Sequence, residues 1–305
     1  MNGQVSSRRR FLREFGLASA GLVAGASSIS AGSPPDLRQR LFCLETWFYK
    51  TELTLREQSK MLHDLGCPRM TYCPGGDVEK WKTFPDALKQ IDQGGSDLTA
   101  TYVVFDIDNP DALKGVETVI SALEGRDTLV WVAFTSTTYK PSDESGDKKA
   151  IPLLQEIADL ADGADLDVSI YHHFNFWGER IADAFRLAEK SERENVGCTF
   201  NLYHWLKVEG PENLRKRIEL TLPRLNCVTI NGSHPNAKEM TVEEGILPLG
   251  KGSYDVESFV AAFVNAGYTG PFGLQGYGIE GDIRTKLQHT LREWETYCAH
   301  IQQNR

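Results

Sequence analysis

The chain has 305 residues, of which 41% are hydrophobic and 25% are charged, and its formal net charge at pH 7 is −9. This composition is typical of a soluble globular protein. The acidic charge disfavours a partner with a phosphate backbone, so we predict no nucleic-acid binding. The six cysteines form no CxxC pair, which disfavours a zinc finger.

The first 31 residues have the pattern of an export signal. Arginines at positions 8, 9 and 10 precede an Ala/Gly-rich apolar stretch over 15–26, and small residues follow up to Ala31. This order is typical of a signal peptide, and the paired arginines with mild hydrophobicity favour the twin-arginine (Tat) type. We therefore predict a Tat-type signal peptide over 1–31, export by the Tat machinery, a periplasmic or extracytoplasmic location, and no membrane attachment after cleavage. An uncleaved anchor or a basic amphipathic helix is the alternative interpretation.

Residues 38–303 repeat one pattern eight times, a short apolar segment followed by a helical one. Strands that alternate with helices predict parallel βαβ units, and eight such units predict a (β/α)8, or TIM, barrel. No linker interrupts the pattern, so we predict a single domain. The expected strands cover 41–47, 69–73, 98–105, 128–134 and 166–171, and three more end at Asn201, Asn231 and Gln275. The expected helices cover 54–65, 84–91, 111–123, 149–160, 177–190, a segment after Pro211, 256–266 and 282–300.

Polar side chains stand at the ends of several expected strands, where a TIM barrel builds its active site. These residues are Glu45, His172, His173, Asn201, Asn231 and Gln275. Neighbouring strand residues point to opposite faces, so the two histidines cannot both face the site, and we prefer His173.

The second half of the chain resembles a known family. The Leu-Gly-Lys-Gly loop at 249–252, the Ala-Gly-Tyr-Thr-Gly-Pro segment at 266–271 and the strand after it resemble the sugar phosphate isomerase/epimerase family of the xylose isomerase-like TIM barrel superfamily. The resemblance is strongest over 167–294. It implies a divalent metal (Mn, Mg, Co or Zn) held by Glu, Asp, His and Glu from strands five to eight. It also implies proton transfer between adjacent carbons of a ketose.

The chain departs from this pattern at the implied metal ligands. Asn201 stands where an Asp is expected and Gln275 where a Glu is expected. A carboxamide keeps the shape of a carboxylate but loses its charge, and hard cations prefer charged oxygen ligands. Two alternatives follow: His173 and His204 hold a metal together with the remaining acids, or no metal is bound.

Four residues are candidates for catalysis. Glu45 is the candidate base, His173 and His204 are candidate acid/base groups or metal ligands, and Lys207 is a candidate cation for an enolate or phosphate. The alternative for the histidines is a hydrogen-bonded cap on the barrel rim.

Five residues are candidates for substrate binding. Asn201, Asn231 and Gln275 suit the hydroxyl groups of a sugar, and Tyr277 and Trp177 suit stacking on its face. The alternatives are an amide network that plugs the mouth and aromatic packing in the core.

Two functions remain open on this basis. The first is an exported carbohydrate-active enzyme of the sugar isomerase/epimerase type, with lyase-like activity as a variant, acting next to the carbonyl of a sugar or oxidised glycoside. The second is a non-catalytic sugar-binding or degenerate TIM barrel. An apurinic endonuclease of the same superfamily is disfavoured by the acidic charge and by the missing metal-binding acids.

Overall fold

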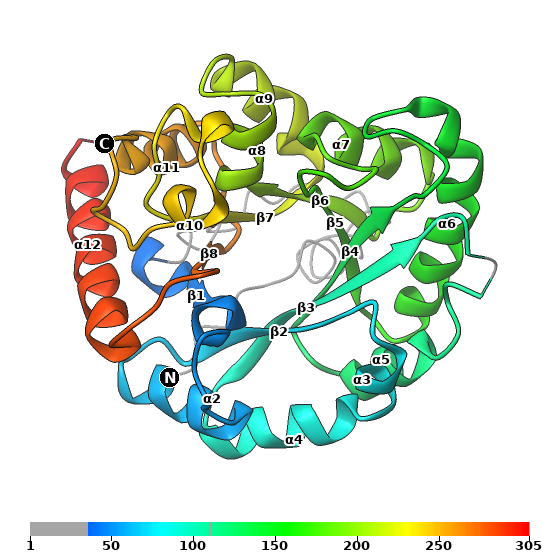
Figure 1. The fold of residues 1–305 in the computed structure, drawn as a ribbon, viewed down its shortest axis with the longest axis horizontal. Helices are drawn as coiled ribbons and strands as arrows, with labels where there is room; N and C mark the ends of the chain where they lie inside the picture. Colours follow the sequence, from blue (N-terminus) through cyan, green and yellow to red (C-terminus); the bar gives the residue numbers. More distant parts are fainter. Residues whose placement is uncertain (1–35, 110, 305) are drawn as a thin grey trace, which may run out of the picture.

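A closed ring of eight parallel strands forms the centre of the molecule (Figure 1). The computed structural model describes residues 36–109 and 111–304, so the predicted signal peptide over 1–31 lies outside the described residues. Each strand pairs with its neighbours in chain order, and β1 pairs with β8 to close the ring. The predicted TIM barrel is confirmed. The strands are β1 (Leu41–Cys43), β2 (Arg69–Gly75), β3 (Asp97–Asp106), β4 (Leu129–Thr135), β5 (Asp167–Tyr171), β6 (Val196–Asn201), β7 (Leu225–Ile230) and β8 (Phe272–Leu274).

Helices surround the barrel and connect consecutive strands (Figure 1). Among the described residues, no helix is long and apolar enough to cross a membrane. The α-helices are α2 (Leu55–Asp64), α3 (Val78–Lys82), α4 (Phe84–Gly94), α5 (Val116–Leu123), α6 (Asp147–Gly163), α7 (Ile181–Lys190), α8 (Leu202–Val208), α9 (Leu214–Thr221), α10 (Val242–Gly245), α11 (Val256–Asn265) and α12 (Ile283–Gln303). The short 3-10 helices are η1 (Leu37–Arg40), η2 (Glu45–Phe48), η3 (Glu144–Gly146), η4 (Leu222–Arg224) and η5 (Ala237–Glu239).

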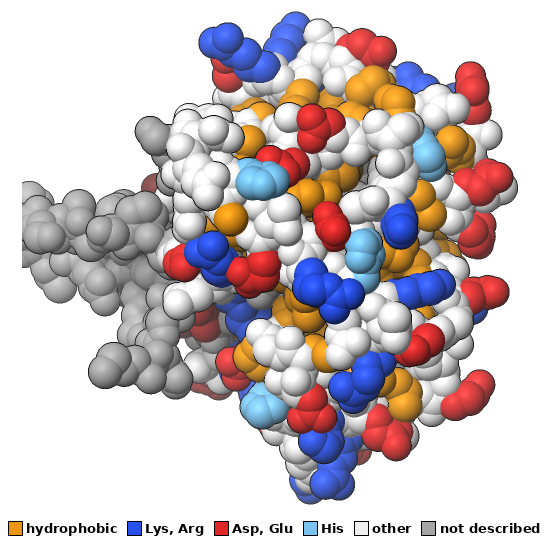
Figure 2. Space-filling view, turned by 90° about the vertical axis from the view of Figure 1, so that its left-hand side faces the viewer, with side chains coloured by type: hydrophobic (Ala, Val, Ile, Leu, Met, Phe, Trp, Pro, Cys, Tyr) orange, Lys and Arg blue, Asp and Glu red, His pale blue; other side chains and the backbone are white. Residues whose placement is uncertain are grey.

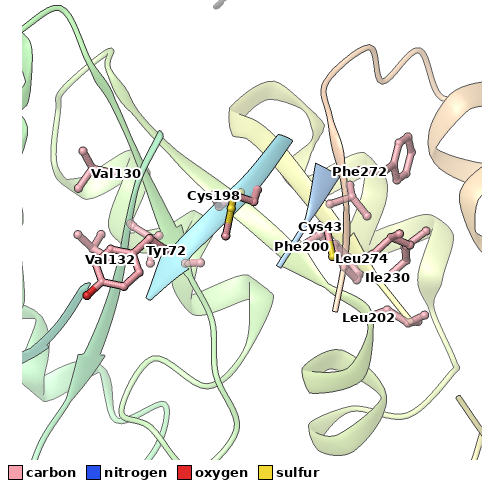
Figure 3. Packing of buried hydrophobic residues seen from close by; sticks show 14 of the residues in the cluster. Cys43, Tyr72, Val130, Val132, Cys198, Phe200, Leu202, Ile230, Phe272 and Leu274 are labelled. Atoms are coloured by element: carbon pink, nitrogen blue, oxygen red, sulfur yellow. The ribbon is translucent and has the colours of Figure 1, made fainter. Parts of the chain in front are cut away.

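The core has two parts because successive strand residues point to opposite faces. Part of the larger cluster, between the strands and the helices, is shown in Figure 3, where Val132, Phe200 and Leu274 are among the labelled side chains. The smaller cluster includes Trp131 and Tyr171, whose ring centroids are 5.0 Å apart. Burial of each such large side chain stabilises the fold by roughly 1.5–3 kcal/mol.

The outer surface carries charges of both signs. Figure 2 views the side on which α12 lies in Figure 1, and acidic and basic side chains are intermixed over that face. This face therefore presents no broad surface of one charge.

The structure corrects the sequence prediction after β6. Only a helix after Pro211 was expected, whereas α8 begins directly at Leu202. The cause is Asn201, whose side-chain oxygen accepts a hydrogen bond from the backbone N–H of His204 and so caps the helix. His204 and Lys207 consequently lie on a helix at the mouth.

Among the other boundaries that differ from the expected ones, three have a local cause or change the place of a candidate residue. The first strand stops at Cys43, so Glu45 begins η2 instead of ending a strand. The helix expected over 111–123 starts at Val116, because Gly115 before it adopts a left-handed φ of 94°. The helix expected over 177–190 starts at Ile181, where the Asp183 carboxylate accepts the N–H of Arg180.

Candidate active site

A buried hydrogen-bond network lies at the carboxyl ends of β5 to β8. The side-chain nitrogen Nδ2 of Asn201 lies 2.5 Å from Tyr171 Oη, 2.6 Å from Thr229 Oγ1 and 2.8 Å from Gln275 Oε1. Its Oδ1 accepts the backbone N–H of His204 at 2.8 Å. Because a backbone N–H can only donate, this bond fixes which end of the amide carries oxygen. Asn201 and Gln275, both predicted as substrate-binding residues, thus contact each other directly, as in the alternative of an amide network at the mouth.

His172 supports this network from outside the mouth. Its Nε2 accepts the backbone N–H of Asn201 at 3.0 Å, so Nδ1 carries the proton and donates to the carbonyl of Glu179 at 3.1 Å. Both ring nitrogens are used, and the side chain is fully buried. Burial lowers the pKa of His172 to about 4, so the ring is neutral at pH 7. The role of His172 is therefore structural.

His173 and His204 form a pair, with ring centroids 4.0 Å apart. His173 Nδ1 donates to the carbonyl of Phe174 at 2.8 Å, which leaves the lone pair on Nε2, and the ring stacks on Phe176 at 4.1 Å. His204 is only 3% exposed, and neither of its ring nitrogens has a hydrogen-bond partner among the described residues. An unpartnered buried polar group costs about 1–3 kcal/mol. These nitrogens are therefore suited to bind an atom of a ligand.

Burial keeps both members of this pair neutral. It lowers the pKa of His173 to about 4, and it lowers the pKa of His204 well below the ordinary value for histidine. A neutral imidazole offers one N–H donor and one acceptor, so the pair can both donate to and accept from a ligand.

Glu45 is a carboxylic acid that titrates near neutral pH. Its Oε2 accepts the backbone N–H of Cys73 at 2.7 Å, which ties η2 to the end of β2. Burial raises the pKa of Glu45 to about 7, while the bond from Cys73 and the charge of Lys80 oppose this rise. A carboxyl group with such a pKa can both take and return a proton at neutral pH.

Glu45 and the histidine pair lie on opposite sides of the mouth. In the closed ring, β1 and β5 are four strands apart in either direction, so the residues that follow them lie on opposite parts of the rim. Glu45 follows β1 and His173 follows β5. The network around Asn201 joins β5 to β8 on one half of the ring.

Two exposed tyrosines pack against each other near Glu45. Tyr277 is 42% exposed and Tyr49 is 46% exposed, and their rings meet edge to face with centroids 5.5 Å apart. Tyr277 was a predicted stacking residue, and the sequence analysis missed Tyr49. Tyr49 follows Trp47 and Phe48, both buried, so an aromatic run alone did not reveal which ring is exposed.

Three predicted site residues make structural contacts. Lys207 donates to the backbone carbonyl of Lys238 at 3.2 Å and to that of Met240, so α8 directs its ammonium group to the η5 loop. Trp177 is 2% exposed and donates to the carbonyl of Asp143, which leaves no free face for a sugar. We therefore do not place Lys207 or Trp177 in the site.

Asn231, the third of these residues, has one free acceptor. It is fully buried and donates to the carbonyls of Gly232 and Gly245 at 2.7 Å and 3.1 Å. Its Oδ1 has no partner among the described residues, so this oxygen can still accept from a ligand.

The residues at the ends of β6 to β8 do not fit a hard divalent cation. Within 36–109 and 111–304, no group of three or more His, Cys, Asp or Glu side chains could hold a metal ion. The oxygen of Asn201 is occupied by the His204 N–H, and the oxygen of Gln275 by the amide of Asn201. His173 and His204 remain as imidazole donors, without a carboxylate in contact with them to complete a ligand set.

Comparison with known proteins identifies the fold family. The chain matches the family model of the xylose isomerase-like TIM barrel over residues 113–294, which is more than half of its length. No curated protein sequence matches it.

Solved structures share the fold at low identity. The 3-keto-D-glucoside 4-epimerase YcjR from E. coli, in its apo form, is 16% identical, with a TM-score of 0.65 over 84% of this chain and 99% of that one. The IolI protein with a zinc atom is 13% identical, with a TM-score of 0.65 over 86% of this chain and 97% of that one. D-psicose 3-epimerase from Clostridium cellulolyticum, with D-tagatose, is 10% identical, with a TM-score of 0.63 over 86% and 99%. With the barrel topology and the family match together, this chain belongs to the xylose isomerase-like TIM barrel family.

Proposed function

We propose that the protein is a sugar isomerase or epimerase that moves a proton at the carbon next to the carbonyl of a keto-sugar or oxidised glycoside. The observation that supports this proposal is the placement of the candidate groups on the rim: Glu45 follows β1, whereas the contacting pair of His173 and His204 follows β5 and β6 on the other part of the ring. A carboxylate base on one part of the rim and an N–H donor for the carbonyl oxygen on the other suit a reaction that removes a proton next to a carbonyl and returns it in a new position.

The reaction begins at Glu45. Its carboxylate takes the proton from the carbon, the C–H electron pair forms the enolate double bond, and the carbonyl oxygen takes up the negative charge. The N–H of the buried, neutral His204 ring has no partner among the described residues and stabilises that oxygen as a hydrogen-bond donor. Return of the proton by the Glu45 carboxyl group to the former carbonyl carbon, with transfer of the neighbouring hydroxyl proton to the enolate oxygen, gives the isomer. A solvent proton delivered to the other face of the original carbon gives the epimer, and Glu45 then releases its proton to solvent.

The remaining polar groups suit recognition of a sugar. Asn231 Oδ1 is a free acceptor for a hydroxyl group, and the Tyr49–Tyr277 pair offers ring faces and edges at the rim. Two fold neighbours are named as epimerases of a keto-glucoside and of a ketose, which supports keto-sugars as the substrates to test first.

We also propose export by the Tat route to the periplasm or another extracytoplasmic space. The support is the arginine-rich, apolar and small-residue order of positions 1–31. Expression in a Tat-competent bacterium should yield a shortened protein outside the cytoplasm. Retention of the full-length chain in the cytoplasm would contradict this part of the proposal.

The second candidate function is a sugar-binding barrel without catalysis. The observation that favours it is the amide network, which places Asn201 and Gln275 where the resembling enzymes carry acids. The test is to incubate the protein with keto-glucosides and ketoses in deuterium oxide and follow the sugar by NMR. Deuterium at the carbon next to the carbonyl supports the enzyme, whereas binding without exchange for every sugar supports the binding protein.

A further inference from the structure

Three side-chain oxygen atoms from three strand ends converge on one buried point. The hydroxyl groups of Tyr171 and Thr229 and the amide oxygen of Gln275 lie 2.5, 2.6 and 2.8 Å from Asn201 Nδ2. Asn201 and Thr229 are fully buried. Several oxygens that converge on one point make the arrangement that holds a cation in many proteins. Here the point is occupied by an amide nitrogen of the chain itself.

The amide cannot be turned around. Its oxygen already accepts the backbone N–H of His204, and a reversed amide would set its own N–H groups against that donor. The two amide hydrogens are directed at three oxygens, and Tyr171 is also hydrogen-bonded to Thr229. A cation could therefore reach this point only by displacing the amide nitrogen.

We propose that the Asn201 carboxamide takes the place of a divalent cation in this chain: its N–H groups hold the oxygens from β5, β7 and the end of β8 together, and no metal binds there. The histidines do not complete a second set of ligands. His173 Nε2 and the nitrogens of His204 are free, but among the described residues no group of three His, Cys, Asp or Glu side chains could hold a metal ion. A carboxylate at position 201 would carry a negative charge, whereas the carboxamide of Asn201 is neutral. The neutral side chain therefore needs no cation to balance it.

The first test measures metal binding by the wild-type chain. The protein is purified without chelator, dialysed against manganese, and analysed for bound metal, and its Tm is measured with manganese, magnesium and zinc and with EDTA. We expect far less than one equivalent of metal and no rise in Tm. One retained equivalent that raises the Tm would overturn the proposal. The readouts are metal content and stability, so the result does not depend on finding the proposed sugar reaction.

The second test exchanges the amide for a carboxylate. Asn201→Asp removes the donors and sets a charge against the three oxygens, so the Tm in EDTA should fall by about 5 °C or more. Manganese should raise the Tm of this variant but not that of the wild type. A variant that is as stable as the wild type, or one that loses stability without any response to manganese, would contradict the proposal that the Asn201 amide takes the place of a cation.

Two control variants separate this effect from general damage. Asn195→Asp makes the same change at an equally buried amide just before β6, where Nδ2 donates to the carbonyls of Ala158 and Leu166, and it should lose stability without a response to manganese. Gln275→Glu adds a carboxylate but keeps the Asn201 amide, so it should also show no response. A gain of metal by Gln275→Glu would overturn the proposal, and this measurement decides the matter if Asn201→Asp does not fold.

Discussion

The side chain of His172 holds the backbone of Asn201 in place: imidazole Nε2 accepts the Asn201 N–H at 3.0 Å. The other ring nitrogen donates to Glu179, so one buried histidine connects the loop after β5 to the end of β6. Replacement by Phe leaves the Asn201 N–H and the Glu179 carbonyl without their partner. We expect His172→Phe to lower the free energy of unfolding by about 1–3 kcal/mol at pH 7.5, measured by urea denaturation. Loss of less than the error of the measurement would contradict this role.

His172 should also make the fold sensitive to acid. Its pKa is about 4 in the folded state and 6.5 as the ordinary value, so the unfolded chain binds the proton more tightly. The stability that neutral His172 contributes to the fold is present above pH 6.5. It is lost as the pH falls towards 4, by at most roughly 3 kcal/mol. His172→Phe should show a shallower loss over this range than the wild type. Replacement of the exposed His63 by Gln is the control for the loss of a histidine side chain as such.

The raised pKa of Glu45 predicts that both the reaction rate and the stability of the fold depend on pH. The reactive form is the carboxylate, so kcat/KM for a keto-sugar should rise with pH and level off above an apparent pKa of about 7. The stability of the fold should change with pH in the opposite direction to the rate. The pKa of Glu45 in the folded state lies above the ordinary value of 4.5. The contribution of Glu45 to the stability of the fold is therefore present below pH 4.5 and is lost as the pH rises through 7. Glu45→Gln should therefore gain stability over the wild type between pH 5 and 8, and equal pH profiles would contradict the raised pKa.

The tyrosine pair should affect affinity more than stability. Both rings are among the most exposed large side chains, so Tyr49→Ala or Tyr277→Ala removes little core packing. We expect each variant to raise KM about 2- to 10-fold, which corresponds to roughly 0.5–1.5 kcal/mol for a lost aromatic contact. Val78→Ala is the control, because Val78 is 39% exposed and lies on α3. An unchanged KM in both tyrosine variants would remove the pair from the sugar site.

Lys207 should matter for stability alone. Its ammonium group binds the carbonyls of Lys238 and Met240, so Lys207→Met removes a link between α8 and the η5 loop. We expect a loss of about 1–3 kcal/mol in unfolding free energy, as for hydrogen bonds to a charged group, with kcat within about twofold of the wild type. A large fall in kcat with normal stability would return Lys207 to the catalytic candidates.

The barrel and part of its mouth could be predicted because they follow from local patterns. Eight apolar segments with helical spacers require parallel pairing, and strand ends in such a barrel meet at one rim. The two histidines after β5 make different contacts: His172 Nε2 accepts the N–H of Asn201, whereas the ring of His173 lies 4.0 Å from that of His204. The preference for His173 as the site residue stays a prediction.

The rest of the site depends on contacts that no local pattern contains. Asn201 is a preferred helix N-cap residue, so the sequence held a signal for α8, but Pro211 gave a stronger signal further along. The hydrogen bonding of the Lys207 ammonium group depends on the loop around Lys238, which is distant in the sequence. The exposure of Tyr49 depends on its packing against Tyr277, which lies more than two hundred residues away. Tertiary contacts of this kind decide which polar or aromatic residue faces the mouth.

The most direct test of the proposed chemistry is the exchange of solvent deuterium into a bound keto-sugar by Glu45→Gln. The substitution keeps the size of the side chain and removes its ability to accept a proton from carbon. We predict that the exchange rate falls by about 100- to 10,000-fold, while the Kd for the sugar, measured by calorimetry, stays within about threefold of the wild type. Exchange at the wild-type rate by this variant would contradict the central claim that Glu45 is the base.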